Sequence, residues 1–321
     1  MSPPTATTEL IADRGEAAAS EEFFRSRPFL DAEGVTHTLR IDAGDAELLA
    51  PLIVGPIGDG PEIDAISPYG YPGLVTSEGA HIDPASVDFS PTGLVSLFVR
   101  HILSDPPLTG AAERNIVQIA DPALPPKSRP SDRRQIRKNL EHGYELHLVP
   151  GPMTTPEQRA GFLMTYEQTM HRTAAEERYF FSPAYFDRIL QAGGTWLALA
   201  HAPGGEIAAA SIAARSDGVL HYYLSGSADA HLRDSPMKNV VAALVEHAAE
   251  LGLPLNLGGG ISPGDPLEEF KRGFANREQP WHTSELVCDR AAYEQLSRGH
   301  ESSGGFFPAY RAIRDSRASG P

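Results

Sequence analysis

The segment from His221 to Phe274 limits the possible folds of this 321-residue chain more than any other segment. It predicts an aromatic strand, a loop, an apolar helix of about four turns and a second short strand. The second strand ends in the glycines 258–260, and one lysine, Lys271, follows between Phe270 and Phe274. Glycine lets a ligand approach the backbone closely, and lysine supplies a compact positive charge. This combination is typical of a binding site in an α/β protein.

The residues before and within this segment predict how its sheet is built. Two amphipathic helices come first, and three strands joined by two hairpin turns follow them. The next helix crosses over to a further strand, so the strands on either side of it should run parallel or nearly so. These elements are expected at residues 155–170, 182–192, 195–202, 206–215, 219–226, 236–251 and 254–257. Their order is that of the GNAT acyltransferase fold, which by itself identifies no substrate.

The length of the chain predicts two domains, because chains beyond about 250–300 residues usually divide. A proline-rich stretch and a basic helix near residues 125–145 mark the passage between them. We therefore expect a disordered leader over residues 1–20, a first domain over 21–143 and a second over 144–299. The first half also predicts strands at residues 36–41, 63–67 and 115–120, an apolar run at 48–54 and a helix at 91–103.

The composition is that of a soluble globular protein, with 41% hydrophobic and 21% charged residues. No apolar run approaches the ~20 residues of a membrane span, and the N-terminal residues do not read as a secretory signal. A single cysteine, Cys288, fits a reducing cytoplasm. The net charge of −15 argues against a protein that coats nucleic acid. One local basic patch exists nevertheless, at Arg133, Arg134, Arg137 and Lys138.

Several segments, in their order and spacing, resemble the Fem family of non-ribosomal peptidyltransferases. They are residues 64–74, 166–181, 221–226, 257–260, 267–274 and 306–311. The resemblance implies an α/β (α+β) protein of two GNAT-like domains with mixed sheets flanked by helices, and a C-terminal tail, residues 300–321, that packs back onto the first domain. It implies transfer of an aminoacyl group from aminoacyl-tRNA, without a bound cofactor. The acceptor would be an amine of a small peptide, a natural product or a peptidoglycan precursor.

The family's Phe-Lys pair corresponds to Phe270 and Lys271, which we take as the candidate catalytic residues. A fixed ammonium could stabilise the oxyanion that forms when an amine attacks an ester. It could instead hold a ribose or phosphate of the tRNA acceptor end. The alternative without function is a surface lysine in an amphipathic turn.

Other residues in the family-like segments are candidates for substrate binding. They are Tyr69, Tyr71, Arg172, Tyr179, Tyr222, Tyr223, Gly258, Gly259 and Gly260. Arg172 could bind a carboxylate or phosphate, or pair with Glu176 or Glu177. Of the two adjacent tyrosines on one strand, one should face the core and the other a cleft, whereas the glycines could simply form a turn. Asp64 is a weaker candidate for binding an amine, and the basic patch could contact tRNA or be a solvated helix face.

The loop before the crossover helix helps to distinguish the possible donors. An acyl-CoA-dependent GNAT enzyme needs glycines there, so that backbone N–H groups can hold the pyrophosphate. The loop has Arg233 but no glycine, while Asp234 would repel phosphate and Pro236 lacks an N–H. We therefore favour aminoacyl-tRNA over acyl-CoA, although the acidic net charge argues the other way. An acyl-CoA-dependent N-acyltransferase and a non-catalytic GNAT-like binding module remain the alternatives.

The histidines do not indicate a metal site, because none has the spacing of a metal-binding motif. His171 and His221 are weak candidates for a general base that accepts the proton of the attacking amine. The sequence identifies neither the transferred amino acid nor the oligomeric state.

Overall fold

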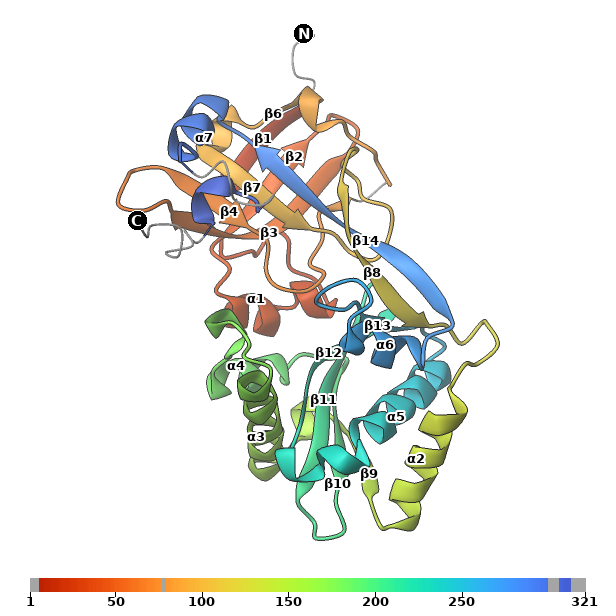
Figure 1. The fold of residues 1–321 in the computed structure, drawn as a ribbon. Helices are drawn as coiled ribbons and strands as arrows, with labels where there is room; N and C mark the ends of the chain where they lie inside the picture. The colour runs from red at the N-terminus through yellow and green to blue at the C-terminus, as the bar shows by residue number, and fades with distance from the viewer. Residues whose placement is uncertain (1–5, 77–78, 300–305, 313–321) are drawn as a thin grey trace, which may run out of the picture. The chain divides into compact units, whose positions relative to one another are not determined.

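The computed structural model describes residues 6–76, 79–299 and 306–312 (Figure 1). Contacts divide the chain into two units. Unit 1 comprises the described residues of 1–19, 33–114 and 281–321, and unit 2 comprises 20–32 and 115–280. After the short stretch 20–32, the chain enters unit 2 a second time within β8 (Ala112–Ala120) and leaves it within β14 (Arg277–Val287). The predicted boundary at 143/144 is therefore wrong, because most of β8 and the proline-rich stretch belong to unit 2.

Unit 1 is built on a mixed sheet with the strand order β6-β1-β2-β3-β4-β7-β14. Strands β1 to β4 are antiparallel neighbours, β4 and β7 are parallel, and β7 and β14 are antiparallel. Its other elements are β1 (Ala6–Ile11), β2 (His37–Asp42), β3 (Glu47–Pro56), β4 (Ile63–Ile66), β5 (Val75–Thr76), β6 (Val87–Asp88), β7 (Leu94–Arg100) and α7 (Arg290–Leu296). Leu39, Ile41, Leu52 and Leu97 are fully buried in its core.

Two expectations for the first half of the chain are wrong. Residues 6–11 of the predicted disordered leader form β1, in which Ala6 and Thr8 are buried and Thr7 and Glu9 are exposed. The expected helix at 91–103 is the strand β7, flanked by β4 and β14. Most of its residues are buried, and a strand covered on both faces has a continuous apolar run that periodicity cannot distinguish from a helix.

Unit 2 is built on a second mixed sheet with the strand order β8-β13-β12-β11-β10-β9. Strands β9 to β12 are antiparallel neighbours, β12 and β13 are parallel, and β13 and β8 are antiparallel. The predicted meander and crossover are thus confirmed. The strands are β9 (Glu145–Pro150), β10 (Thr195–His201), β11 (Ile207–Ser216), β12 (Val219–Ser227) and β13 (Leu255–Gly258).

Helices cover both faces of this second sheet (Figure 1). On one face α3 packs against β11 and β12, and on the other α5 packs along β9 to β13 and contacts α2. The helices of unit 2 are α1 (Arg27–Glu33, whose last residue falls in unit 1), α2 (Pro130–Glu141), α3 (Pro156–Arg172), α4 (Pro183–Ile189), α5 (Met237–Glu250) and α6 (Pro266–Arg272). The approach of α3 to β12 depends on Gly226, because a Cβ there would overlap with the backbone of Thr165 and Tyr166.

The two sheets have the same pairing pattern, although no internal repeat is visible in the sequence. Apart from β6, a short edge strand parallel to β1, each has four antiparallel strands, then a parallel pairing, then an antiparallel last strand. In unit 2 the parallel strands are joined by α5, whereas the described residues between β4 and β7 contain no α-helix. The predicted fold class, two GNAT-like domains with mixed sheets, is confirmed.

The described part of the C-terminal tail, residues 306–312, packs within unit 1. Arg311 donates two hydrogen bonds of 2.6 Å to Asp64 on β4. Tyr310 bridges Asp64 at 3.0 Å and Ser96 on β7 at 2.6 Å. The carboxylate of Asp64 is therefore engaged by the chain's own cation, which argues against it as an amine-binding group. Residues 300–305 and 313–321 of the predicted tail lie outside the described residues.

Candidate functional site

The site is built where the parallel strands β12 and β13 stop pairing. Their ladder has two positions, Leu220 with Leu255 and His221 with Asn256. Against β11 the register shifts, so that Tyr223 is an extra residue of β12, as in a β-bulge. Beyond the ladder, β13 continues into the glycines 258–260.

The glycine turn is shaped by close packing inside unit 2. Gly258 has a φ of +75°, in the left-handed region that favours glycine. A Cβ on Gly259 would overlap with the side chain of Asn115, and a Cβ on Gly260 would lie 2.6 Å from Asp265 Oδ1. Asp265 also accepts backbone hydrogen bonds that hold the loop after the turn. These glycines are thus required by the protein's own packing.

Lys271 is buried beneath this turn and is not a surface lysine. It lies on α6, whose first turn is capped by Asp265 through a hydrogen bond of 2.7 Å from Glu268 N. The residue is 8% exposed, and Nζ donates a hydrogen bond of 2.6 Å to Gly259 O. Burial lowers the pKa of Lys271 to about 8, against the opposing effect of the Asp265 carboxylate. The structure therefore brings together Lys271 and the three glycines, as the sequence predicted.

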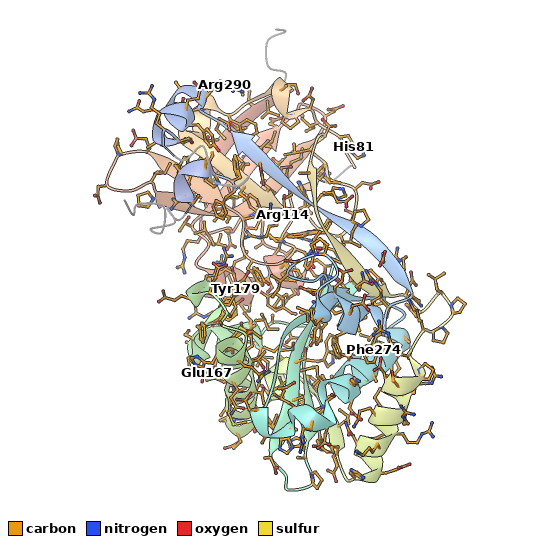
Figure 2. The ribbon with its side chains drawn as sticks, in the orientation of Figure 1. His81, Arg114, Glu167, Tyr179, Phe274 and Arg290 are labelled. Carbon is orange, nitrogen blue, oxygen red and sulfur yellow. The ribbon has the colours of Figure 1, made fainter. Side chains whose placement is uncertain are left out.

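Phe270 packs against the hydrophobic core of unit 2, beside Lys271 on α6. Its ring lies 5.6 Å from that of Phe274, which is labelled in Figure 2 and is itself buried. The core there includes Val240 and Leu244 of α5. Phe270 thus fixes the position of α6.

The two adjacent tyrosines of β12 lie against different hydrophobic clusters. Tyr222 packs on the α5 side of the sheet and donates a hydrogen bond of 2.6 Å to Ser225, and burial raises its pKa to about 12. Tyr223 shares a hydrogen bond of 3.0 Å with Tyr185 of α4. Its ring contacts those of Phe23, Phe24 and Phe29. Both side chains are half-buried, so the expected division into one core and one cleft residue is too simple.

Arg172 ties α3 to the end of β12. Its guanidinium pairs with Asp229 and donates to Ser227 O at 3.3 Å. Glu176, one of its predicted partners, pairs instead with Arg178. The carbonyl of Tyr179 (Figure 2) accepts a hydrogen bond of 2.7 Å from Tyr166. These contacts of Arg172 therefore hold α3 against the end of β12.

The loop before α5 uses its backbone N–H groups internally. Ser235 N donates to Leu232 O at 3.1 Å, Lys238 N to Ser235 O at 3.0 Å, and Asn239 N to Pro236 O at 3.0 Å. Ser235 has a φ of +49°. Because these donors are occupied and Pro236 has none, the loop as folded offers few N–H groups to a pyrophosphate.

Asp234 in the same loop is held by groups from two other elements. Its carbonyl accepts a hydrogen bond of 2.8 Å from Asn139 on α2, and its carboxylate accepts one of 2.9 Å from the hydroxyl of Tyr144. Arg233, by contrast, is largely exposed at the surface of the loop. The loop thus places a carboxylate beside backbone N–H groups that are partly used within the protein.

The basic patch lies on the outer face of α2. Arg133, Arg134, Arg137 and Lys138 are all exposed. On the inner face, the buried Asp132 pairs with Lys238 of α5 at 2.9 Å. The patch is therefore a solvated helix face, and the structure leaves it accessible to a polyanion.

Tyr69 and Tyr71 belong to unit 1, in the loop after β4. Tyr69 N donates a hydrogen bond of 2.9 Å to Glu33, and the ring of Tyr71 lies 5.3 Å from that of Trp281. They are thus not part of the group of side chains around Lys271 within unit 2.

Three polar residues that shape the site, Asn115, Asn256 and Asp265, were missed by the sequence analysis. Asn256 and Asp265 flank the glycine cluster in the sequence, and Asn and Asp often hydrogen-bond to the backbone of a turn. That signal could have identified these two, whereas Asn115 is remote in sequence. The weak candidate His221 is 2% exposed and burial lowers its pKa to about 4, so it is a neutral core residue.

Within residues 6–76, 79–299 and 306–312, no group of three or more His, Cys, Asp or Glu side chains is placed to hold a metal ion. In the same part of the chain, no helix combines the length and the apolar character needed to cross a bilayer.

Residues 126–272 match the family described as Acetyltransferase (GNAT) domain. The structure is similar to FemX, with a TM-score of 0.58 and 11% identity over 80% of this chain and 89% of that one. It is also similar to the C-terminal domain of a protein described as a lysylphosphatidylglycerol synthetase from Agrobacterium fabrum (TM-score 0.54, 14% identity, 88% and 92% covered). L-PGS from Bacillus licheniformis gives a TM-score of 0.51 at 13% identity, with 81% and 86% covered. No curated protein matches the sequence significantly. The predicted resemblance to the Fem family is thus confirmed at the level of the fold.

Proposed function

We propose that this protein transfers an aminoacyl group from aminoacyl-tRNA to the amine of a small peptide, a natural product or a peptidoglycan precursor. The observation that carries the proposal is the buried ammonium of Lys271 at the end of β13, next to a turn in which Gly258 has a left-handed φ and the backbone packs closely. Burying a charge costs free energy unless the charge is paired and hydrogen-bonded, so a buried ammonium with few partners is a candidate for function. Lys271 has one hydrogen bond to a carbonyl, and its ammonium has three donors.

In the proposed reaction the acceptor nitrogen attacks the ester carbonyl carbon of the aminoacyl-tRNA. The carbonyl oxygen becomes an oxyanion, and the ammonium of Lys271 stabilises that charge in a poorly hydrated environment. The C–O bond to the ribose then breaks as the amide forms, and the proton lost by the amine leaves with the ribose hydroxyl. The protein contributes positioning and charge stabilisation, and no covalent enzyme intermediate forms.

The remaining candidates have supporting parts in this proposal. Phe270 holds α6, and Gly258, Gly259 and Gly260 allow the turn to approach Lys271. Tyr222, Tyr223, Arg172 and Tyr179 of unit 2 and Tyr69 and Tyr71 of unit 1 are proposed to bind or shape the sites of the substrates. Their replacement should then raise KM more than it lowers kcat.

The choice of donor is supported by the loop before α5 and by one structural relative. The loop has no glycines, and several of its N–H groups are already bonded, which disfavours acyl-CoA. The relative described as a lysylphosphatidylglycerol synthetase takes its name from a product that joins lysine to a lipid. An aminoacyl donor is consistent with that name, although the acceptor differs from the amine proposed here.

The basic patch on α2 is proposed to contact the phosphates of the tRNA. Its four cations are exposed on one helix face of a chain whose net charge is −15. Such contacts release counterions, so tRNA binding should weaken steeply as salt rises. Replacing Arg134 and Arg137 by glutamate should raise KM for tRNA and reduce this salt dependence, with kcat little changed.

An acyl-CoA-dependent N-acyltransferase is the second candidate function. It is favoured by one observation, the match of residues 126–272 to the acetyltransferase (GNAT) domain family. A non-catalytic GNAT-like binding module is the third possibility. It leaves the burial of the Lys271 ammonium unexplained.

A single transfer assay distinguishes these functions. The full-length protein is incubated with a mixture of amine acceptors and either tRNA charged with radiolabelled amino acids or labelled acetyl-CoA, with and without ribonuclease. We expect transfer from charged tRNA that ribonuclease abolishes. Transfer that requires acetyl-CoA and survives ribonuclease would contradict the proposed donor.

Lys271→Met tests the proposed role of the lysine in the same assay. Removing one group that stabilises an oxyanion lowers kcat about 100-fold to 1000-fold in other enzymes, and a loss of that size is expected here. Lys127→Met, which removes an exposed lysine of unit 2, is the matched control and should retain the wild-type rate. Full activity of Lys271→Met would remove the lysine from the mechanism.

A further inference from the structure

A buried polar pair, His221 and Asn256, lies next to the glycine turn. The two residues occupy the last position of the ladder between β12 and β13 and are 2% and 1% exposed. Asn256 Nδ2 lies 3.1 Å from His221 Nδ1. Buried polar side chains cost free energy unless they are hydrogen-bonded, so a pair retained in a core indicates a specific requirement.

The direction of each hydrogen bond in this pair is determined by the backbone. Gly258 N–H can only donate, and it lies 2.8 Å from Asn256 Oδ1. The amide oxygen of Asn256 therefore faces the turn, and its NH₂ group faces His221. Since NH₂ donates, Nδ1 of His221 must accept, and the ring is neutral with its proton on Nε2.

The hydrogen bonds lead from this pair to Lys271. The bond from Gly258 N to Asn256 holds the left-handed conformation of Gly258, where φ is +75°. The next residue, Gly259, then presents its carbonyl to Lys271 Nζ at 2.6 Å. The turn also covers the lysine, since a Cβ on Gly258 would lie 3.2 Å from Nζ.

We propose that His221 and Asn256 are positioning residues, which hold the Gly258–Gly259 turn and through it the ammonium of Lys271. His221 orients the amide of Asn256, Asn256 holds Gly258, and the turn places the carbonyl that binds the lysine. The effect of this pair on transfer rests on the proposed function. The effect of the pair on the exposure of Lys271 is independent of the proposed function.

The test measures how fast Lys271 is acetylated by trace acetic anhydride in the folded, full-length protein, with the product quantified by mass spectrometry. Asn256→Leu removes the acceptor for Gly258 N and should increase the rate about tenfold, because the turn opens more often. Asn139→Leu is the matched control. It removes another buried asparagine of unit 2, which binds Asp234 O and Asn239, and it should leave the rate at Lys271 unchanged.

Two substitutions at His221 test the other half of the pair. His221→Phe keeps a ring of similar size but removes the acceptor for Asn256, and it should also accelerate labelling. His221→Gln restores a side-chain acceptor and should bring the rate back towards that of the wild type. The proposal would be overturned if Lys271 is labelled at the wild-type rate in Asn256→Leu or in His221→Phe, provided that the variant folds. It would also be overturned if Asn139→Leu accelerates the labelling of Lys271 as much as these variants do.

The transfer assay adds a readout that separates this inference from the proposed function. Asn256→Leu should lower kcat with little change in KM, and it should lower the rate no further when Lys271→Met is already present. An additive effect in the double variant would contradict action through Lys271. If the wild type transfers no aminoacyl group, the proposed function fails, while the labelling rates still decide whether the pair positions the lysine.

Discussion

Lys271→Met should change how the stability of unit 2 depends on pH. The ordinary pKa of lysine is 10.5, and burial lowers that of Lys271 to about 8 in the folded protein. Between these two pH values the unfolded chain still binds a proton that the folded chain has released. Raising the pH therefore favours the folded state across this window.

The size of the effect follows from the difference in pKa. A change of roughly 2.5 pKa units corresponds to about 3 kcal/mol. This is the free-energy penalty for burying the ammonium below pH 8, and it should disappear as the pH approaches 10.5. Methionine has a similar length and no charge, so Lys271→Met should be at least as stable as the wild type at pH 7. A substitution that abolishes activity and does not reduce stability is the behaviour expected of a functional lysine.

The assay is urea unfolding at several pH values between 7 and 10.5, followed by the fluorescence of Trp196 on β10. A Trp281→Phe background restricts the signal to unit 2, since Trp281 belongs to unit 1. The free energy of unfolding of the wild type should rise by about 3 kcal/mol relative to Lys271→Met over this range. Lys127→Met, which alters an exposed lysine, should show the same pH dependence of the free energy of unfolding as the wild type. If the free energy of unfolding of Lys271→Met depends on pH in the same way as that of the wild type, Lys271 is not desolvated in the folded protein.

Three other substitutions test a close backbone approach, an ion pair and a helix cap in unit 2, each by urea unfolding. Gly226→Ala should cost about 2–3 kcal/mol, because the new Cβ overlaps with Thr165 O on α3; an unchanged midpoint would contradict this close approach. Asp217→Asn should cost about 3 kcal/mol, since it removes the carboxylate charge that lies 2.6 Å from the buried guanidinium of Arg25; an unchanged free energy of unfolding would contradict this. Asp265→Ala should cost about 1 kcal/mol through loss of the α6 cap. Backbone hydrogen bonds, chiefly from Glu268, lower the pKa of Asp265, so the contribution of this carboxylate to stability should be present near neutral pH and be lost in acid. If Asp265→Ala loses as much stability in acid as the wild type does, this prediction is refuted.

The elements of the second half of the chain could be predicted because their signals are local. Thr155 and Gln158 form a capping box at the start of α3, and Pro183 is the first residue of α4. The hairpin turns at 203–205 and 216–218 separate strands of suitable length. Each of these signals acts within a few residues, so tertiary contacts do not need to be known.

The first half shows where local signals fail. Residues 6–11 form a strand only because β2 and β6 pair with them. The apolar run of β7 fits a helix as well as a strand until its neighbours β4 and β14 are known. The boundary between the units depends in the same way on the pairing of β8 with β13, strands separated by more than a hundred residues.

The glycine cluster and the lysine that follow the crossover strand are visible in the sequence alone, and the family resemblance singled out Lys271. The burial of this lysine could be seen only in the fold, because it depends on the carbonyl of Gly259 and on packing against distant elements. It also showed that Asn256 holds the turn, through a hydrogen bond whose direction follows from the backbone. Residue types near a turn are readable from local sequence, whereas solvation and hydrogen-bond partners are set by residues that only folding brings together.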